Sequence, residues 1–160
     1  MIPFGLAEPQ IKQRYLNFLE ANSLSLIEYL QQLFATPLQN DVLSAEVQIF
    51  IQEDRMEIPE IWIYYSGVQN KISATPAEQI YAGQSFEIKI DFKKTFALAV
   101  EYYQNSHYHH IFADLTKQWF AICWWKACGW QYTIPCQVHA HDYGDANTIQ
   151  LTAKEAQQKK

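Results

Sequence analysis

The spacing of apolar residues changes along this chain from the period of a helix to the period of a strand, and then back again. Within residues 9–36 the apolar side chains recur every three or four positions, which places them on one face of a helix. Asn22-Ser23 interrupts the pattern and Pro37 ends it, so this segment is predicted to form a helical hairpin. Within residues 45–52 apolar and polar side chains alternate, which is typical of a half-buried strand.

Later segments repeat both patterns. Four of them have the composition or the alternation of strands: residues 61–65, 86–90, 132–140 and 147–152. Two further helices are predicted between them, one that begins at Asp91 and one that runs from about Asp114 to Cys128 and ends at Gly129. The core face of the second of these helices is expected to carry Leu115, Trp119, Ile122 and Cys123.

Helices that lie before and between groups of strands indicate an α+β fold. We expect an N-terminal helical hairpin and two further helices packed on one mainly antiparallel sheet of about five strands. The length of 160 residues matches one domain of about 100–200 residues, and a hydrophobic content of 49% supplies its core. No repeat or long linker divides the chain, so residues 1–160 are predicted to form a single domain with a frayed polar tail at 153–160.

The net charge of −5 is concentrated in one short stretch. Residues 41–60 contain six acidic residues and one cation, so six minus one accounts for the whole excess of five. Such a chain repels a phosphate backbone, which argues against nucleic acid as a direct partner. A basic protein is favoured instead, because opposite potentials speed encounter. The predicted partner-binding residues are Glu53, Asp54, Glu57 and Glu60. A solvated loop is the first interpretation of this acidic connection, an acidic docking surface for a basic partner is the second, and metal binding is the third.

Three features predict a cytoplasmic protein that does not enter a membrane. The three cysteines are an odd number without a Cys-x-x-Cys pair, unlike the even set of a secreted disulfide framework. The first ten residues, MIPFGLAEPQ, lack the cationic and apolar regions of a signal peptide. The longest apolar run, residues 119–125, is far shorter than a membrane span of about 20 residues.

One short motif has the composition of a metal site. In a strand, His139 and His141 of His139-Ala-His141-Asp142 would point to the same side, and Asp142 could add an oxygen ligand. A closed zinc site needs about four ligands, and only these three are at hand, so we predict no bound metal. A second imidazole cluster, His107-Tyr-His109-His110, is expected in a loop. We favour the interpretation that both clusters are surface imidazoles, because short motifs readily match by chance.

No nucleophile or cofactor motif is evident. Cys123 lies on the predicted core face of a helix, where a neutral buried thiol is expected. Cys136 follows Pro135 but belongs to no recognisable catalytic signature. The chain has five glycines and no glycine-rich phosphate loop. No catalytic residue and no cofactor is therefore assigned.

The tryptophans of the last predicted helix cannot all face the core. Trp119 is placed on the core face, whereas Trp124 and Trp125 are consecutive, so at least one of them must leave the core stripe. We expect that tryptophan to pack over the edge of the sheet, with an anchor in an interface as the alternative.

The last quarter to third of the chain carries a further pattern. It consists of Asp114-Leu-Thr-Lys-Gln-Trp119-Phe-Ala-Ile-Cys123-Trp124, then Lys126-Ala-Cys-Gly129, and later His141-Asp142. This pattern resembles one found in small immunity proteins of bacterial polymorphic-toxin and contact-dependent inhibition systems. The resemblance implies a small cytoplasmic inhibitor that binds one cognate toxin domain tightly. Such proteins are often acidic because many of their toxins are basic nucleases, and they share no catalytic residues.

Two hypotheses follow from the sequence. The first is a protein-binding inhibitor, an immunity protein that neutralises a cognate bacterial toxin through an acidic surface. The second is a metal-dependent enzyme or metal-binding protein that uses His139, His141 and Asp142. A structural domain with an unrelated partner is the remaining interpretation.

Overall fold

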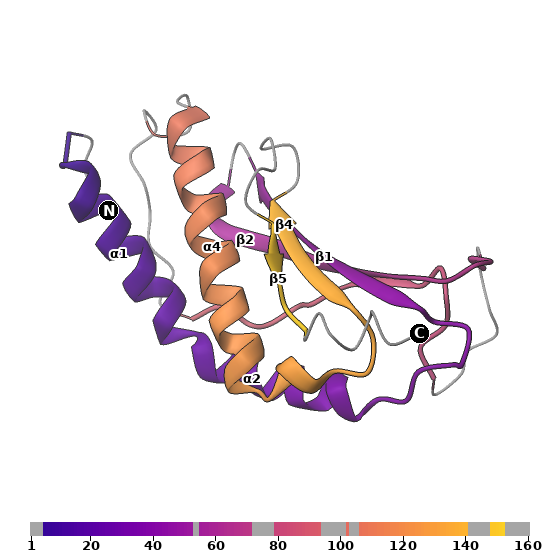
Figure 1. Cartoon of the computed structure of the whole chain (residues 1–160). Helices are drawn as coiled ribbons and strands as arrows, with labels where there is room; N and C mark the ends of the chain where they lie inside the picture. The colour runs from indigo at the N-terminus through magenta and orange to yellow at the C-terminus, as the bar shows by residue number, and fades with distance from the viewer. Residues whose placement is uncertain are drawn as a thin grey trace.

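The chain forms one mixed sheet with helices packed against it (Figure 1). The computed structural model describes residues 5–52, 55–71, 79–93, 102, 106–140 and 148–152, with residues 55–57 and 106 described by their backbone alone. The elements in order are α1 (Glu8–Ala21), α2 (Ser23–Ala35), β1 (Ser44–Gln52), β2 (Arg55–Ser66), β3 (Ser85–Glu87), α4 (Ser106–Lys126), the 3-10 turn η1 (Gly129–Gln131), β4 (Cys136–Ala140) and β5 (Ile149–Gln150). The predicted α+β class is confirmed.

The five strands lie in the order β3-β2-β1-β4-β5. Three of the four neighbouring pairs are antiparallel, as expected for a mainly antiparallel sheet. The exception is β1 with β4, which run parallel, with Val47 opposite Val138. A parallel pair needs a long crossover connection, and α4 lies within it.

One face of the sheet is buried beneath the helices. Along β1, the alternate residues Ala45, Val47, Ile49 and Ile51 are buried, so the strand predicted from their spacing is confirmed. Helix α4 packs on this face, and α1 packs in turn against α4 (Figure 1). Between the two helices the Tyr15 ring stacks on Phe112 with centroids 4.2 Å apart. The Tyr15 hydroxyl lies 2.8 Å from Thr116 Oγ1, which satisfies two polar groups in a buried contact.

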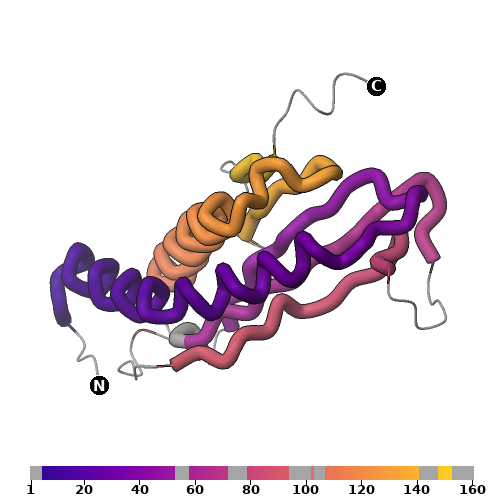
Figure 2. Tube along the Cα trace, turned by 90° about the horizontal axis from the view of Figure 1, so that it is seen from below, coloured from indigo at the N-terminus to yellow at the C-terminus, as the bar shows by residue number. Residues whose placement is uncertain are grey.

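The predicted N-terminal helical pair is confirmed, and a single residue, Asn22, joins its two helices. Asn22 is 1% exposed. Its side-chain amide donates to the carbonyl oxygens of Phe18 and Lys93, and its side-chain oxygen accepts the Lys93 N–H at 2.7 Å. The chain bends at this residue, and α2 continues past the end of α4 and along the sheet (Figure 2).

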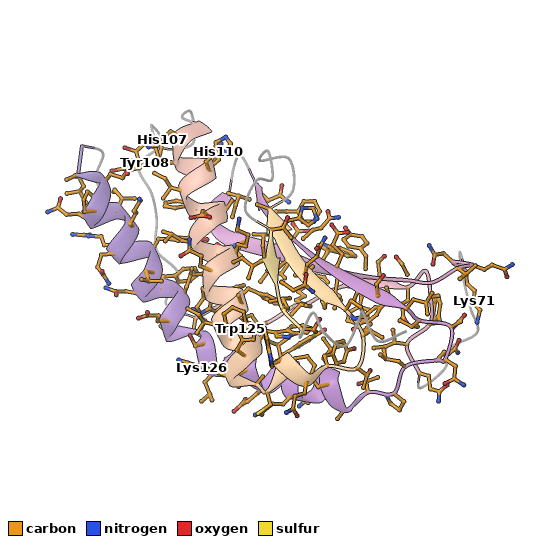
Figure 3. The ribbon with its side chains drawn as sticks, viewed as in Figure 1. Lys71, His107, Tyr108, His110, Trp125 and Lys126 are labelled. Atoms are coloured by element: carbon orange, nitrogen blue, oxygen red, sulfur yellow. The ribbon has the colours of Figure 1, made fainter. Side chains whose placement is uncertain are left out.

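Helix α4 begins eight residues earlier than the predicted start at Asp114. The imidazole cluster at residues 107–110 therefore lies in the first turns of a helix, and its expected position in a loop is wrong. His107 Nε2 contacts Glu8 Oε1 at 2.6 Å, which links the start of α4 to the start of α1 (Figure 3). This hydrogen bond is the main reason why the pKa of Glu8 is lowered.

The predicted core face of α4 is only partly right. Trp119 and Cys123 are buried, but Ile122 is 48% exposed and Leu115 is half-buried. The buried stripe instead continues through Phe112, Phe120 and Trp124, which turns it away from Ile122. Within the predicted helix, Phe120 and Trp124 therefore occupy the core, whereas Leu115 lies at its margin and Ile122 lies outside it.

Strand boundaries also differ from the prediction. Strand β2 begins at Arg55, so Glu57 and Glu60 belong to a strand, and the expected solvated connection is wrong for these two residues. The third strand ends at Glu87 rather than near residue 90. The helix expected from Asp91 is absent over residues 91–93, and residues 94–100 lie outside the described part. The predicted tail at 153–160 also lies outside it. No helix among the described residues is long and apolar enough to cross a membrane.

Candidate functional site

The face of the sheet opposite α4 carries polar and aromatic side chains, and no described helix packs on it (Figure 1). We call this surface the open sheet face. It is defined by the half-buried residues Glu46, Gln48 and Phe50 of β1, Glu60, Trp62 and Tyr64 of β2, Glu87 of β3, and Gln137 and His139 of β4. These side chains share one side because successive residues of a strand point to opposite faces.

Trp62 lies near the middle of the open sheet face. In the register, Gln48 lies opposite it on β1 and Glu87 lies opposite it on β3. Its indole Nε1–H donates to Glu60 Oε1 at 3.0 Å. The Tyr64 ring lies nearly parallel to the indole, at 25° and with centroids 6.4 Å apart. Trp62 therefore has an aromatic ring beside it along its own strand and carboxylates beside it on two strands.

The electrostatics of this face are acidic. Glu46, Glu60 and Glu87 contribute three carboxylates, and none of the residues that define the face is a Lys or an Arg. Arg55, opposite Gln52 at the start of β2, is described by its backbone alone. The pKa of the Tyr64 hydroxyl is raised, mainly by burial and to a smaller extent by the carboxylates of Glu46 and Glu60. A cation that approached Trp62 would meet attraction from three sides.

Glu60 is oriented by two donors. Besides the indole of Trp62, the side-chain amide of Gln52 donates to Glu60 Oε2 at 2.6 Å. A carboxylate has about four lone-pair sites, so both oxygens retain the capacity to accept from a further donor. Because its rotamer is already held, less side-chain entropy would be lost when Glu60 binds a partner.

The four acidic residues predicted to bind a partner have different outcomes. Glu60 lies on the open sheet face, where its carboxylate accepts a hydrogen bond from the indole of Trp62. Glu57 belongs to β2, but only its backbone is described. Glu53 and Asp54, which connect β1 to β2, lie outside the described residues.

Sequence reasoning missed Glu46, Trp62, Tyr64 and Glu87. A signal for them was present, because each occupies a polar or aromatic position that alternates along its strand with residues packed in or against the core. What the alternation could not reveal is which strands become neighbours. The acids of β1 and β3 lie beside Trp62 only because β2 is placed between these strands.

The predicted metal motif is described at one residue only. His139 lies in β4, where its Nε2 contacts Glu46 Oε1, while His141 and Asp142 lie outside the described residues. Within the described ranges, no three residues of the types His, Cys, Asp and Glu are grouped so that they could hold a metal ion.

The cysteines on the core side have no thiolate character. Cys123 and Cys136 are buried, and burial raises the pKa of Cys123 to about 11 and also raises that of Cys136. Cys128, which is exposed, follows the end of α4 with a left-handed backbone at φ 69°. No described base is arranged to activate Cys123 or Cys136 as a nucleophile.

A second, smaller surface lies at the C-terminal end of α4. Trp125, labelled in Figure 3, is 39% exposed, whereas its neighbour Trp124 is fully buried. Trp130 is 47% exposed, and its ring centroid lies 6.1 Å from that of Trp125. The Trp125 indole donates to the carbonyl oxygen of Leu151, just beyond β5, at 3.1 Å. The prediction that one tryptophan leaves the core and packs over the edge of the sheet is thus confirmed.

Comparisons with known proteins add no family to this geometry. No protein-family model matches the chain, and neither the curated proteins nor the solved structures contain a match.

Proposed function

We propose that this chain is a protein-binding module that neutralises a basic partner by docking it on the open sheet face. The observation that carries the proposal is Trp62, an aromatic side chain in the middle of an uncovered face, with carboxylates on neighbouring strands. Tryptophan is enriched among the residues that dominate binding energy at protein interfaces. An acidic surround selects a basic partner, because like charges brought together at an interface cost free energy.

The partner that we propose is the toxic domain of a bacterial toxin, and the chain would be its immunity protein in the cytoplasm. The support for this step is the resemblance of residues 114–142 to the C-terminal pattern of small immunity proteins. The net charge of −5 agrees with it, because a cationic nuclease would be attracted over a long range. An inhibitor of this kind needs a surface and no catalytic residue.

The test is protection from a toxin in living cells. If the gene directly upstream encodes a cationic C-terminal domain, that domain is expressed in a bacterial host with and without the chain, and growth is measured. We expect the chain to restore growth and the double reversal E60K/E87K to lose at least about tenfold in plating efficiency, since rim and central charges both contribute.

The control is E20K/E28K, which changes the net charge equally at two exposed positions of α1 and α2. This variant should protect like the parent chain. If both reversals abolish protection, or if neither affects it, the open sheet face is not the surface that neutralises the toxin. The absence of any toxic domain beside the gene would remove the immunity part of the proposal.

A further inference from the structure

A groove of about 520 Å³ lies at the end of the open sheet face, between β2 and the segment that follows β3. The groove exists because the pairing of β2 with β3 ends at Pro59. On the β3 side of β2, Ile61 accepts from the Ile88 N–H, and Tyr65 both donates and accepts. Backbone groups of alternate strand residues point to the same edge, so Pro59 also faces this side, where it has no N–H to donate. Pairing with β3 stops, and the chain beyond Ile88 leaves the strand.

The lining of this groove is mixed, with five apolar residues and four polar or charged ones, Gln52, Glu60, Glu87 and Lys89. Ile58 and Pro59 line one side, and Ile88, Ile90 and Phe92 line the other. Phe92 is held from behind by aromatic contacts with Phe18 and Trp119 of the helices, with centroids 5.6 and 6.3 Å away. The groove therefore rests on the main core rather than on a loose segment.

Two carboxylates line the groove at its border with the open sheet face, those of Glu60 and Glu87, which belong to both. Glu60 is held beside Trp62 by the indole hydrogen bond, so the groove is continuous with the open sheet face. No ion pair joins either carboxylate to a cation within the described residues. The exposed Lys89 also lines the groove, so the described part of its lining carries two acidic groups and one basic group. Arg55, opposite Gln52 of this lining, is described by its backbone alone.

We propose that this groove receives an arginine side chain of the basic partner, an inference that rests on the proposed function. The aliphatic stem of arginine matches the apolar part of the lining, Ile58, Ile90 and Phe92, as long cationic side chains bury their stems and keep their heads at the surface. The guanidinium would then meet the Glu60 carboxylate and the face of Trp62. Its planar fork suits a carboxylate, and it stacks on aromatic rings better than the compact ammonium of lysine does.

A peptide strand fits this edge less well than a side chain does. Strand addition depends on a row of backbone donors and acceptors along the free edge. Pro59 removes a donor from that row, and proline on an edge strand is a recognised obstacle to such pairing. The edge is thus closed to backbone pairing, whereas the groove beside it is open to a side chain.

The experiment titrates three capped tripeptides into the ¹⁵N-labelled chain. They are acetyl-Gly-X-Gly-amide with X as arginine, lysine or citrulline, the last being a neutral analogue of arginine. The indole N–H of Trp62, assigned by W62F, and the amides of residues 58, 60 and 87–90 are followed by NMR. We expect saturable shifts with the arginine peptide, binding about tenfold weaker with lysine, and no binding with citrulline.

Variants place the contact. E60Q/E87Q should lose the arginine response at least about tenfold, and the control E20Q/E28Q should keep it. Equal affinity for the citrulline and arginine peptides would overturn the proposal, as would lysine binding as tightly as arginine or shifts that avoid the groove. The comparison of the three peptides uses the parent chain, so it tests the proposal even if a variant folds poorly.

The two proposals fail separately. A chain that neutralises a basic partner at the same affinity with and without E60Q/E87Q would keep the proposed function and remove the arginine contact. A chain that binds the arginine peptide in the groove but neutralises no partner would keep the contact and remove the function.

Discussion

Trp119 and Ile122 are three residues apart on α4, and the sequence placed both on its core face. Trp119 is 3% exposed, and its indole donates to Ser23 Oγ at 2.8 Å, whereas Ile122 is 48% exposed. Periodicity assigns a face to within about one residue, because any helical stripe has neighbours at similar angles. Packing against α1 and α2 decided between them, and that information is not local to the helix.

Replacing these two residues by alanine should therefore lower the free energy of unfolding by very different amounts. Trp119→Ala should lower the free energy of unfolding by roughly 3–5 kcal/mol, the range for removing a large buried aromatic side chain. Ile122→Ala should change it by no more than about 0.5 kcal/mol, as exposed substitutions usually do. Urea denaturation followed by circular dichroism measures both. Similar losses for the two variants would mean that the face assigned to α4 is incorrect.

The three cysteines allow a chemical check at the same scale. Only the thiolate is alkylated, and a pKa of about 11 for Cys123 leaves almost no thiolate at pH 8. Burial raises the pKa of Cys136 as well and also shields its sulfur. Iodoacetamide at pH 8 should therefore modify the exposed Cys128 alone, and the other two only in denaturant. Mass spectrometry of tryptic peptides provides the measurement. Rapid labelling of Cys123 in the folded chain would contradict its burial.

At the scale of elements, local patterns predicted what local forces determine. Strand β1 and the pair α1–α2 followed from apolar spacing alone. The early start of α4 was missed because His107, His109 and His110 give its first turns the composition of a polar loop. The start of β2 was missed because charged residues and Pro59 precede its apolar part. The start of α4 is stabilised by a partner distant in sequence, Glu8 for His107, whereas the start of β2 pairs with the adjacent end of β1.

The candidate site residues could also be predicted only as far as local patterns determine them. Glu60 was predicted from the local excess of acids, and the polar side of β1 could be assigned from alternation. The neighbours of these residues depend on the parallel pairing of β1 with β4 and on the position of β2 between β1 and β3. Such pairings join residues far apart in the chain, and no short-range pattern encodes them.

Asn22 is the residue on which the junction of α1 and α2 depends. Its side chain makes three hydrogen bonds to backbone groups of Phe18 and Lys93 while being almost fully buried. Asn22→Ala leaves those backbone groups unpaired, and a buried unsatisfied group costs about 1–3 kcal/mol. We expect a loss of that size in the free energy of unfolding, measured by urea denaturation. Asn17→Ala is the control, because its side chain bonds only to the exposed Gln13. Equal effects of the two would show that the junction does not depend on Asn22.

At the scale of the whole molecule, the acidic excess and the open sheet face have separable effects on binding. Charges anywhere on the surface contribute to attraction at long range, which raises the association rate. Charges inside the contact also hold the complex together, so their loss raises the dissociation rate. Charge reversals of equal size at two surface positions can therefore distinguish long-range attraction from direct contact with the partner. This requires that the association and dissociation rates are measured separately.

Glu53 and Asp54 provide the first place, and Glu60 and Glu87 provide the second. We predict that E53K/D54K and E60K/E87K both slow association with the toxic domain that the chain neutralises. In both variants the salt dependence should flatten, because less attraction remains for salt to screen as the Debye length falls to about 8 Å at physiological ionic strength. Only E60K/E87K should also speed dissociation, by about tenfold or more, since its residues lie beside Trp62 and the groove. Surface plasmon resonance at low and high salt yields both rates. Dissociation that is faster in E53K/D54K than in E60K/E87K would place the contact at the connection between β1 and β2 instead of the open sheet face.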